Sequence, residues 1–260
     1  MMLSSCVLSI GKEIISGFTN DTNSFFISSR LTNIGIYNRF ILSVDDEEGD
    51  IVSCIKACLD KVDIIITTGG LGPTFDDITV SSVAKALNKE LVFSRASYNR
   101  IETFYKRLYD AGKIDSPEMN DKRKKMAYIP KGAIEIENNV GAASGIYLKE
   151  NGKHIFCLPG IPKEMKPMFE GFVFKTLKGF SDSCILSKTY EFRINDETIL
   201  GRFIDKLKSS DMHIKSLPTG FDSKIMGVRF TAYGKDHQDC LSKIELTKNK
   251  LQQALEQYNA

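Results

Sequence analysis

The sequence lacks the long apolar segment that a membrane-spanning helix needs. No stretch approaches about 18 consecutive apolar residues, and the start of the chain is too polar for a signal peptide. Its charges also nearly cancel, since 35 basic residues stand against 33 acidic ones. A formal charge of +2 gives no global field that would attract nucleic acid or an anionic membrane. We therefore expect a cytoplasmic protein that binds neither nucleic acid nor a membrane.

Cysteine and histidine are too scattered to indicate a disulfide framework or a metal site. The six cysteines contain no C-x-x-C pair, which favours reduced thiols in the core. Cys54 and Cys58 lie one helical turn apart, but no histidine is near them in the sequence. We interpret both as core residues rather than metal ligands.

Three common catalytic motifs are also missing. The sequence contains no G-x-x-x-x-G-K-[ST] segment, no G-x-G-x-x-G after its first predicted strand, and no G-x-S-x-G segment. These absences argue against a P-loop NTPase, a Rossmann-type dinucleotide site and an α/β-hydrolase nucleophile.

Apolar segments and helical patterns alternate in the first part of the chain. Strands are predicted over residues 6–10, 37–44 and 62–67, with helices over 23–34 and 47–61 between them. Repeated strand–helix–strand order predicts a parallel sheet with helices on both faces. The expected fold class is α/β, a doubly wound and mostly parallel sheet. With 260 residues and 42% hydrophobic content, the chain can also form a second small domain.

The pattern changes in the last third of the chain. Residues 189–194 and 224–233 alternate polar and apolar positions, as half-buried strands do. Asp196 is expected to cap an amphipathic helix, and another helix closes the chain. This order predicts a small α+β domain of KH-like or ferredoxin-like type. The expected domains are residues 1–180 and 181–260.

A glycine-rich segment, residues 67–79, follows one of the buried strands. Its glycines would let backbone N–H groups approach an anion closely, and Asp76 and Asp77 follow them. A tight strand-to-helix turn would explain the glycines equally well. Carboxylates are also favourable at the positive end of a helix, so one of the pair could serve the helix alone. Phosphate binding and a plain turn both stay open from these residues.

Three further segments follow predicted strands: residues 11–23, 44–48 and 158–165. In a doubly wound sheet such loops gather at the carboxyl edge, so their side chains are expected to lie near the glycine turn. Asp46 taken alone is best explained as a cap for the helix that follows. Beside Asp77 at the same edge, it becomes a candidate ligand for a shared divalent metal.

Three other segments each have two interpretations. The basic run at 122–125 is either a solvated loop face or a source of one phosphate contact. The loop at 138–145 either contacts a ligand or only precedes a strand. The prolines at 159–162 either fix the shape of a loop beside the site or start a helix.

Taken together, these segments resemble the molybdopterin-binding superfamily, and most closely the N-terminal part of the competence/damage-inducible protein A (CinA) family. The resemblance spans about residues 5–175, and the tail is similar to that family's KH-like middle domain. The combination is specific, whereas no single segment is. The segments that carry it are residues 11–13, 21–24, 67–79, 125–130, 141–145 and 158–168.

The resemblance implies a metal-dependent pyrophosphatase that hydrolyses ADP-ribose, and a related domain of eukaryotic FAD synthases hydrolyses FAD. It implies catalytic roles for Asp46, Asp76 and Asp77, with Asp46 and Asp77 holding a divalent cation (Mg2+, Mn2+ or Co2+) and K+ as a further ion. Water would attack phosphorus while glycine-turn amides and a lysine stabilise the charge. A homodimer is also implied. The implied substrate-binding residues are Glu13, Asn23, Thr68, Gly69, Gly70, Gly72, Thr74, Thr79, Lys125, Gly141, Gly145, Pro159, Gly160, Pro162 and Glu164.

Two residues depart from the usual pattern of that family. Lys12 stands where an acidic or amide residue is common, so its charge would either weaken a metal site or pair with phosphate. Ser144 stands where proline is common. The sequence also stops before the C-terminal amidohydrolase domain of full-length members, which acts on nicotinamide mononucleotide, so deamidase activity is not expected.

Two other functions stay open. One is adenylyl transfer or metal insertion on molybdopterin, in molybdenum cofactor biosynthesis. The Asp76-Asp77 pair argues against it, because the resembling transferases tend to have a basic residue before the essential aspartate. The other is a non-catalytic nucleotide-binding or pterin-binding protein, which the change at Lys12 favours.

Overall fold

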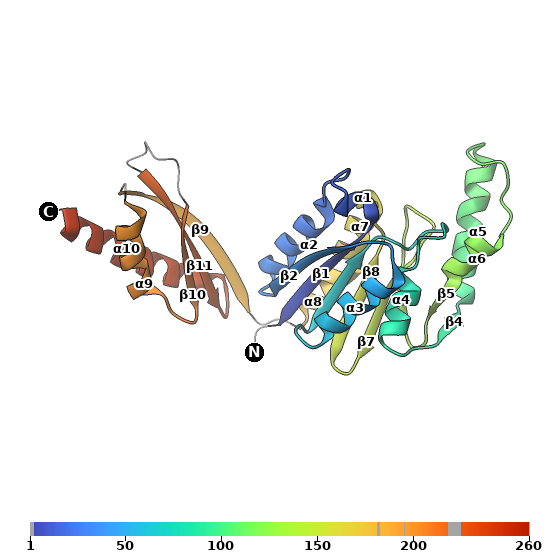
Figure 1. Ribbon diagram of the computed structural model, residues 1–260, viewed down its shortest axis with the longest axis horizontal. Helices are drawn as coiled ribbons and strands as arrows, with labels where there is room; N and C mark the ends of the chain where they lie inside the picture. Colours follow the sequence, from blue (N-terminus) through green and yellow to red (C-terminus); the bar gives the residue numbers. More distant parts are fainter. Residues whose placement is uncertain (1–2, 181–182, 195, 218–224, 260) are drawn as a thin grey trace. The chain divides into compact units, whose positions relative to one another are not determined.

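A computed structural model describes residues 3–180, 183–194, 196–217 and 225–259 (Figure 1). The chain divides into two compact units. The larger contains Leu3–Leu31 and Tyr37–Gly179, and the smaller contains Thr32–Ile36 together with the chain from Phe180 onward. Within the described part of the chain, no helix is both long and apolar enough to cross a membrane.

The larger unit is built on a six-stranded sheet in the order β2-β1-β3-β8-β7-β6. The first four strands of that order are parallel to one another, whereas β7 is antiparallel to both of its neighbours, β8 and β6. The expected α/β class with a mostly parallel sheet is therefore confirmed. The strands are β1 (Ser4–Ile10), β2 (Tyr37–Val44), β3 (Ile64–Thr68), β6 (Ile134–Ile136), β7 (Gly145–Glu150) and β8 (Lys153–Leu158).

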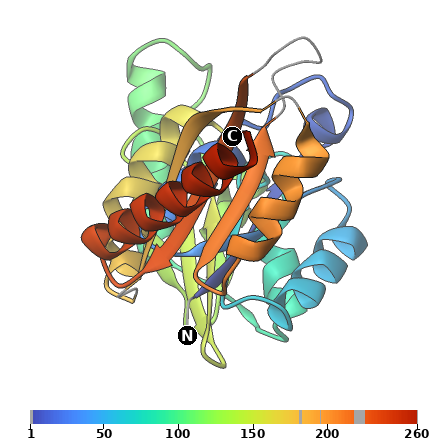
Figure 2. The ribbon, with the colours of Figure 1, turned by 90° about the vertical axis from the view of Figure 1, so that its left-hand side faces the viewer.

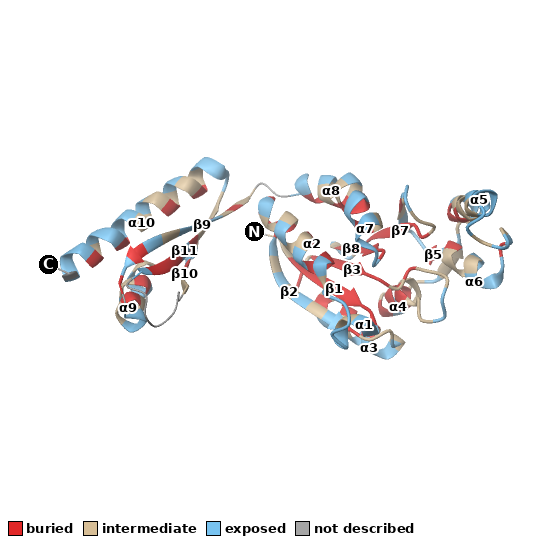
Figure 3. Ribbon diagram, turned by 90° about the horizontal axis from the view of Figure 1, so that it is seen from above, coloured by how far each residue is buried: buried red, intermediate tan, exposed pale blue. Residues whose placement is uncertain are grey.

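Helices cover both faces of this sheet. In the view of Figure 3, α2, α7 and α8 lie on one side of the strands, while α3 and α4 lie on the other. A π-helical turn over Phe169–Val173 joins α7 to α8. The helices are α1 (Lys12–Ile15), α2 (Thr22–Asn33), α3 (Glu48–Leu59), α4 (Thr79–Ala86), α7 (Pro162–Met168) and α8 (Phe174–Lys178).

The central strands are buried because their sequences are apolar. Every residue of β3 is buried, and β1 is buried from Ser5 to its end. Strand β2 at the edge alternates exposed and partly buried residues instead. Strands covered on both faces by helices need continuous apolar sequence, and edge strands do not. Figure 3 shows the resulting core as buried strands between more exposed helices.

A two-stranded antiparallel ribbon and a long helix extend the larger unit after α4. Strand β4 (Leu91–Phe93) pairs with β5 (Tyr128–Pro130), and α5 (Arg95–Asp110) and α6 (Asp121–Lys124) lie between them in the sequence. A single turn of 3-10 helix, η1 (Lys125–Ala127), leads into β5. This part has a small core of its own, centred on Ile101, Met119 and Ala127.

The smaller unit has the order β9 (Cys184–Arg193), α9 (Glu197–Leu207), β10 (Met212–Leu217), β11 (Ile225–Gly234) and α10 (His237–Asn259). Its three strands form an antiparallel sheet in the order β10-β11-β9. Figure 2 shows α9 and α10 on the same face of that sheet. The expected small α+β fold is thus confirmed, and Asp196 caps α9 by accepting hydrogen bonds from the N–H groups of Thr198 and Ile199.

Some predicted boundaries were wrong. The strand expected over residues 62–67 is β3 at Ile64–Thr68, and the glycine turn leads to a helix that starts at Thr79 rather than at the two aspartates. The antiparallel pairing of β6 with β7 was not predicted, although one interpretation of the loop at 138–145 had a strand follow it. Strand β6 has only three residues, too few to show the period of a strand.

Candidate functional site

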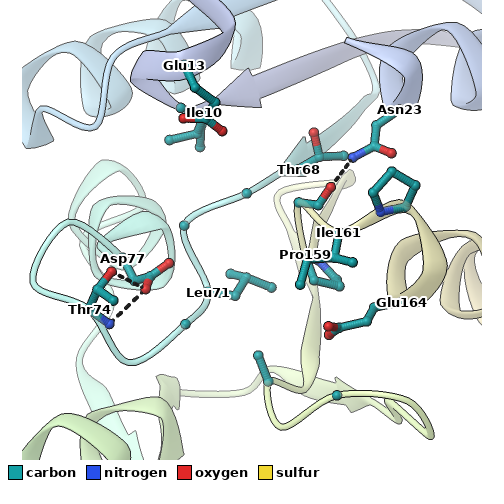
Figure 4. A pocket seen from close by; sticks show the side chains of 18 of the residues that line it. Ile10, Glu13, Asn23, Thr68, Leu71, Thr74, Asp77, Pro159, Ile161 and Glu164 are labelled. Atoms are coloured by element: carbon teal, nitrogen blue, oxygen red, sulfur yellow. Dashed lines mark hydrogen bonds between the residues drawn. The ribbon is translucent and has the colours of Figure 1, made fainter. Parts of the chain in front are cut away.

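The loops at the carboxyl ends of β1, β2, β3 and β8 surround one cavity of about 700 Å³, which we call the main cavity. In Figure 4, Asp77 and Thr74 lie across it from Pro159 and Glu164. Parallel strands bring these loops together because all of their carboxyl ends meet at one sheet edge. Residues of the β6–β7 loop and one residue of α5 complete the wall.

Most of the predicted site residues line the main cavity. The exceptions are Thr79, Lys125 and Gly145, which are discussed below. The predicted residues that line it are Glu13, Asn23, Asp46, Thr68, Gly69, Gly70, Gly72, Thr74, Asp76, Asp77, Gly141, Pro159, Gly160, Pro162 and Glu164.

The main cavity is strongly acidic. Six of its lining residues carry carboxylates, while none of the described lining residues is lysine, arginine or histidine. An anionic ligand entering such a cavity would meet like charges on several sides, and this repulsion is costly wherever water is excluded. A phosphate-bearing ligand would therefore need to bring a cation with it. The six residues are Glu13, Asp21, Asp46, Asp76, Asp77 and Glu164.

The conformation and close packing of the turn require glycine at two of its positions. Gly69 and Gly70 have φ angles of 100° and 67°, which favour glycine. A Cβ on Gly69 would lie 2.2 Å from the Ile10 carbonyl oxygen, and one on Gly70 would lie 2.2 Å from Thr79 Oγ1. Thr79 is fully buried, and its hydroxyl donates to the Gly69 carbonyl at 2.8 Å. Thr79 therefore holds the turn from behind rather than lining the cavity.

Asp76 and Asp77 hold the loop that follows the turn. The Thr74 N–H and hydroxyl donate to Asp77 Oδ2 at 2.8 and 2.7 Å, and the same hydroxyl contacts Asp76 Oδ1. This contact with Thr74 keeps the pKa of Asp76 below its ordinary value. Helix α4 is capped at Ile78, without a side-chain cap. In these contacts each carboxylate uses one oxygen, so the other can reach a ligand.

Asp46 does not cap the helix after it, so that interpretation was wrong. Helix α3 starts at Glu48 with Glu47 as its N-cap, and Asp46 Oδ2 instead accepts the Lys12 N–H at 3.0 Å. Burial raises the pKa of Asp46; the Lys12 N–H opposes this, while the charges of Glu13, Asp76 and Asp45 add to it. Carboxylates from three loops are therefore close enough to repel one another.

The Lys125 side chain contacts backbone carbonyls of the protein and does not line the cavity. Its ammonium donates to the carbonyl oxygens of Thr74 and Asp77, the latter at 3.1 Å. Burial lowers the pKa of Lys125, whereas the charges of Asp77 and Asp76 raise it. The lysine thus supports the aspartate loop from outside the cavity. The Lys12 side chain is exposed and does not line the cavity either.

The opposite wall is fixed by contacts between loops. Asn23 Nδ2 donates to the Gly160 carbonyl at 2.7 Å, which ties the start of α2 to the loop after β8. Pro162 occupies the first turn of α7, where a backbone N–H has no partner within the helix, so the missing N–H of proline costs nothing. A Cβ on Gly145 would lie 2.7 Å from Met168 Cε. Gly145 therefore packs in the sheet, away from the cavity.

Phe104 is a cavity residue that the sequence did not reveal. It lies on α5, in which only Ser97 and Ile101 are buried. Met126 and Val140 also line the cavity; neither was named as a site residue, although ligand contact was one interpretation of the loop that contains Val140. All three come from the ribbon, the helix and the antiparallel strands whose position relative to the parallel sheet could not be read from local patterns.

Comparisons with known proteins place the chain in a family. The family model described as "Probable molybdopterin binding domain" matches residues 6–179. A curated relative from Pyrococcus furiosus is 42% identical over 246 residues, covering 94% of this chain and 95% of the relative. Another from Saccharolobus solfataricus is 35% identical over 257 residues, covering 97% and 92% respectively.

A solved structure of CinA from Thermoplasma acidophilum, described as a protein of unknown function, is 33% identical with a TM-score of 0.60. The match covers 66% of this chain and 98% of that protein. The sheet and its loop-lined cavity thus define a molybdopterin-binding type of α/β protein. The chain belongs to this molybdopterin-binding domain family, and its resemblance to CinA is confirmed.

Proposed function

We propose that the protein is a metal-dependent hydrolase of nucleotide diphosphates, with ADP-ribose as the leading substrate and AMP and ribose 5-phosphate as products. The observation that carries this proposal is the main cavity, which is rich in carboxylates and lined by no described basic side chain. A diphosphate carries two negative charges near neutral pH. An anionic ligand of this kind would be stable in the cavity only if cations accompanied it.

The donor set suits a hard divalent cation. Within the described residues, no group of three or more histidine, cysteine, aspartate or glutamate side chains forms a ready-made metal cage. Mg2+ is typically held by one or two carboxylates, with water and substrate phosphates completing its shell. Asp46 and Asp77, from different loops of the same cavity, would supply those carboxylates. When bound, such a cation would neutralise the diphosphate and make water a better nucleophile.

The chain's own residues would orient the substrate. Water adds to one phosphorus and the bridging P–O bond breaks, giving two phosphate monoesters. The two protons of the water are carried by these products or pass to solvent as the products ionise. The Gly69 N–H already donates to the Leu158 carbonyl at 3.0 Å. The other backbone N–H groups of the glycine turn would face the phosphate oxygens, as fixed donors do in many phosphate sites. Thr74 and Lys125 would keep Asp76 and Asp77 in place through the contacts described above.

The test is product analysis across a panel of cations. Purified protein would be incubated with ADP-ribose and EDTA, Mg2+, Mn2+ or Co2+, each with and without K+, and AMP would be measured by chromatography. We expect AMP release with at least one divalent cation and none with EDTA. Binding of ADP-ribose without AMP under every condition would instead favour a non-catalytic nucleotide-binding protein.

A second candidate function is a step of molybdenum cofactor biosynthesis, such as adenylyl transfer to molybdopterin. The family match supports it, because that family is described by molybdopterin binding. The acidic cavity suits this chemistry as well, since a nucleoside triphosphate donor also requires divalent cations. Pterin fluorescence that copurifies with the protein, together with ATP-dependent modification of added pterin, would favour this function over hydrolysis.

A further inference from the structure

A second cavity of about 260 Å³ adjoins the main cavity, and we call it the annex. The two share Phe104, Gly141 and Ala142 as lining residues, so they meet at these three positions. A single elongated ligand could occupy both. The annex lies between one side of α5 and the loop that joins β6 to β7.

The loop side of the annex is held rigidly. Asn138 Oδ1 accepts the N–H groups of Val140 and Gly141, and its Nδ2 donates to the Ala143 carbonyl and to Glu164 Oε2. A Cβ on Gly141 would lie 2.0 Å from Glu164 Oε2, so a larger residue would displace the Glu164 carboxylate. The loop is therefore preorganised, and its small residues leave open the space that Phe104 also borders.

The annex differs chemically from the main cavity. Arg100 and Arg107 line it, whereas the described lining of the main cavity contains no arginine. Arg100 forms an ion pair with Glu135, which leaves Arg107 as the exposed cation of the annex. The side-chain amides of Asn99 and Asn139 also line it, and neither has a hydrogen bond among the described contacts.

An aromatic ring beside free amides is the usual means of binding a planar nitrogen heterocycle. Every base has a π face that stacks on an aromatic side chain, and amides can pair with its edge. Phe104 has its ring in edge contact with Tyr105 at 5.7 Å between centroids, which helps to fix its orientation. Its position at the junction would put a stacked heterocycle in the annex and leave the diphosphate in the main cavity.

We propose that the annex binds the heterocycle of the substrate, with Phe104 stacked on its face and Asn99 and Asn139 hydrogen-bonded to its edge. This inference rests on the proposed function for the position of the diphosphate. It adds where the heterocycle of such a substrate binds and which residues recognise it. Adenine and pterin share the required chemistry.

The experiment uses a feature of the sequence, which contains no tryptophan. A Phe104→Trp variant therefore has one fluorescent reporter at the junction of the two cavities. Tyr109→Trp is the matched control, because it lies on the same helix, is 47% exposed and lines neither cavity. Each variant would be titrated with AMP, ADP-ribose, ribose 5-phosphate and a simple pterin in the presence of Mg2+.

We expect saturable quenching of the Phe104→Trp fluorescence by ADP-ribose and AMP, none by ribose 5-phosphate, and none in Tyr109→Trp with any ligand. Quenching by pterin at lower concentration than by AMP would identify pterin as the preferred heterocycle and would also support the annex. Equal responses to AMP and ribose 5-phosphate would overturn the proposal.

A second variant covers the case in which tryptophan does not fit. Phe104→Leu keeps apolar volume but removes the aromatic face, and by calorimetry it should weaken AMP binding about five- to hundredfold while leaving ribose 5-phosphate binding unchanged. Equal loss for both ligands would contradict the annex as a heterocycle site. These readouts measure binding and are independent of turnover. If the protein releases AMP from ADP-ribose but neither Phe104 variant changes ligand binding, the annex proposal is wrong and the proposed function stands.

Discussion

The carboxylates at the two ends of the parallel sheet have opposite electrostatic surroundings. Asp63 lies at the amino end of β3, where Ser4 donates two hydrogen bonds of 2.9 Å to its Oδ2 and Lys153 lies 3.6 Å from its Oδ1. Asp46 lies at the carboxyl end of β2, where the nearby charges of Glu13 and Asp76 are also negative.

The pKa values follow this difference. Burial alone would raise the pKa of Asp63, but the hydrogen bonds from Ser4 and the charge of Lys153 outweigh it and lower the pKa. At Asp46, burial and three like charges prevail and the pKa is raised. The amino end is a structural ion-pair site that the chain completes itself. The cavity at the carboxyl end has no cationic side chain among its described lining residues, as expected of a site that takes cations from outside.

The largest effect is expected from removing one carboxylate at the carboxyl end. Asp77→Asn keeps an oxygen that can accept from Thr74 but loses the charge, so AMP release from ADP-ribose should fall on the order of a thousandfold. The matched control is Asp60→Asn, at the exposed end of α3, which should leave AMP release unchanged. Equal activity of wild type and Asp77→Asn would contradict the proposed role of this end.

The next prediction tests the turn that shapes the carboxyl end. Gly69→Ala would place a methyl group against the Ile10 carbonyl at a φ of 100°, and should lower the free energy of unfolding by roughly 3 kcal/mol. Gly17→Ala has a φ of 73° with nothing within 4 Å of the added Cβ, so it should cost only about 1 kcal/mol. Urea unfolding measures both, and equal losses would show that the contact with Ile10 is unimportant.

A smaller effect is expected at Lys125, the cation that lies outside the main cavity. Lys125→Met removes the donor to the Thr74 and Asp77 carbonyls, so the free energy of unfolding should fall by about 1 kcal/mol. Activity should fall about tenfold through movement of the aspartate loop. Exposed Lys122→Met is the control. If Lys125 touched phosphate directly, the variant would weaken ADP-ribose binding strongly while stability stayed normal.

The smallest effect is expected at the amino end of the sheet. Because the folded pKa of Asp63 is lowered, its stabilisation is fully present above its unfolded pKa, about 3.9, and is lost as pH falls through the folded value. Asp63→Asn should therefore lower the free energy of unfolding by about 1 kcal/mol at pH 6, with wild type and variant converging as the pH falls below the folded pKa of Asp63. A difference that does not change with pH would contradict the ion pair. At pH 6 the variant should release AMP from ADP-ribose as fast as wild type.

The sequence revealed the parallel part of the fold because that part has a strong local signal. Apolar strands such as β3 and amphipathic helices such as α3 can be recognised from periodicity alone. The gathering of their loops at one edge then follows from topology. This is why Asp46, Asp77 and Gly160 could be predicted to lie near one another before any coordinates were known.

The rest depended on contacts between distant segments. Whether Lys125 points to a ligand or to the carbonyls of Thr74 and Asp77 is decided across about fifty residues of chain. Phe104 reaches the cavity only because α5 packs beside the β6–β7 loop, and no residue near it in the sequence indicates this. Asp46 looked like a helix cap because its local sequence suits one, whereas the N–H it accepts comes from Lys12.

The central claim is that the main cavity accepts an anionic nucleotide only together with a divalent cation. Isothermal titration of ADP-ribose into wild-type protein, in EDTA and in Mg2+ or Mn2+ at constant ionic strength, tests it directly. The account predicts that the cation strengthens binding at least tenfold and that Asp77→Asn removes most of this gain. Equally tight binding of ADP-ribose in EDTA would contradict it.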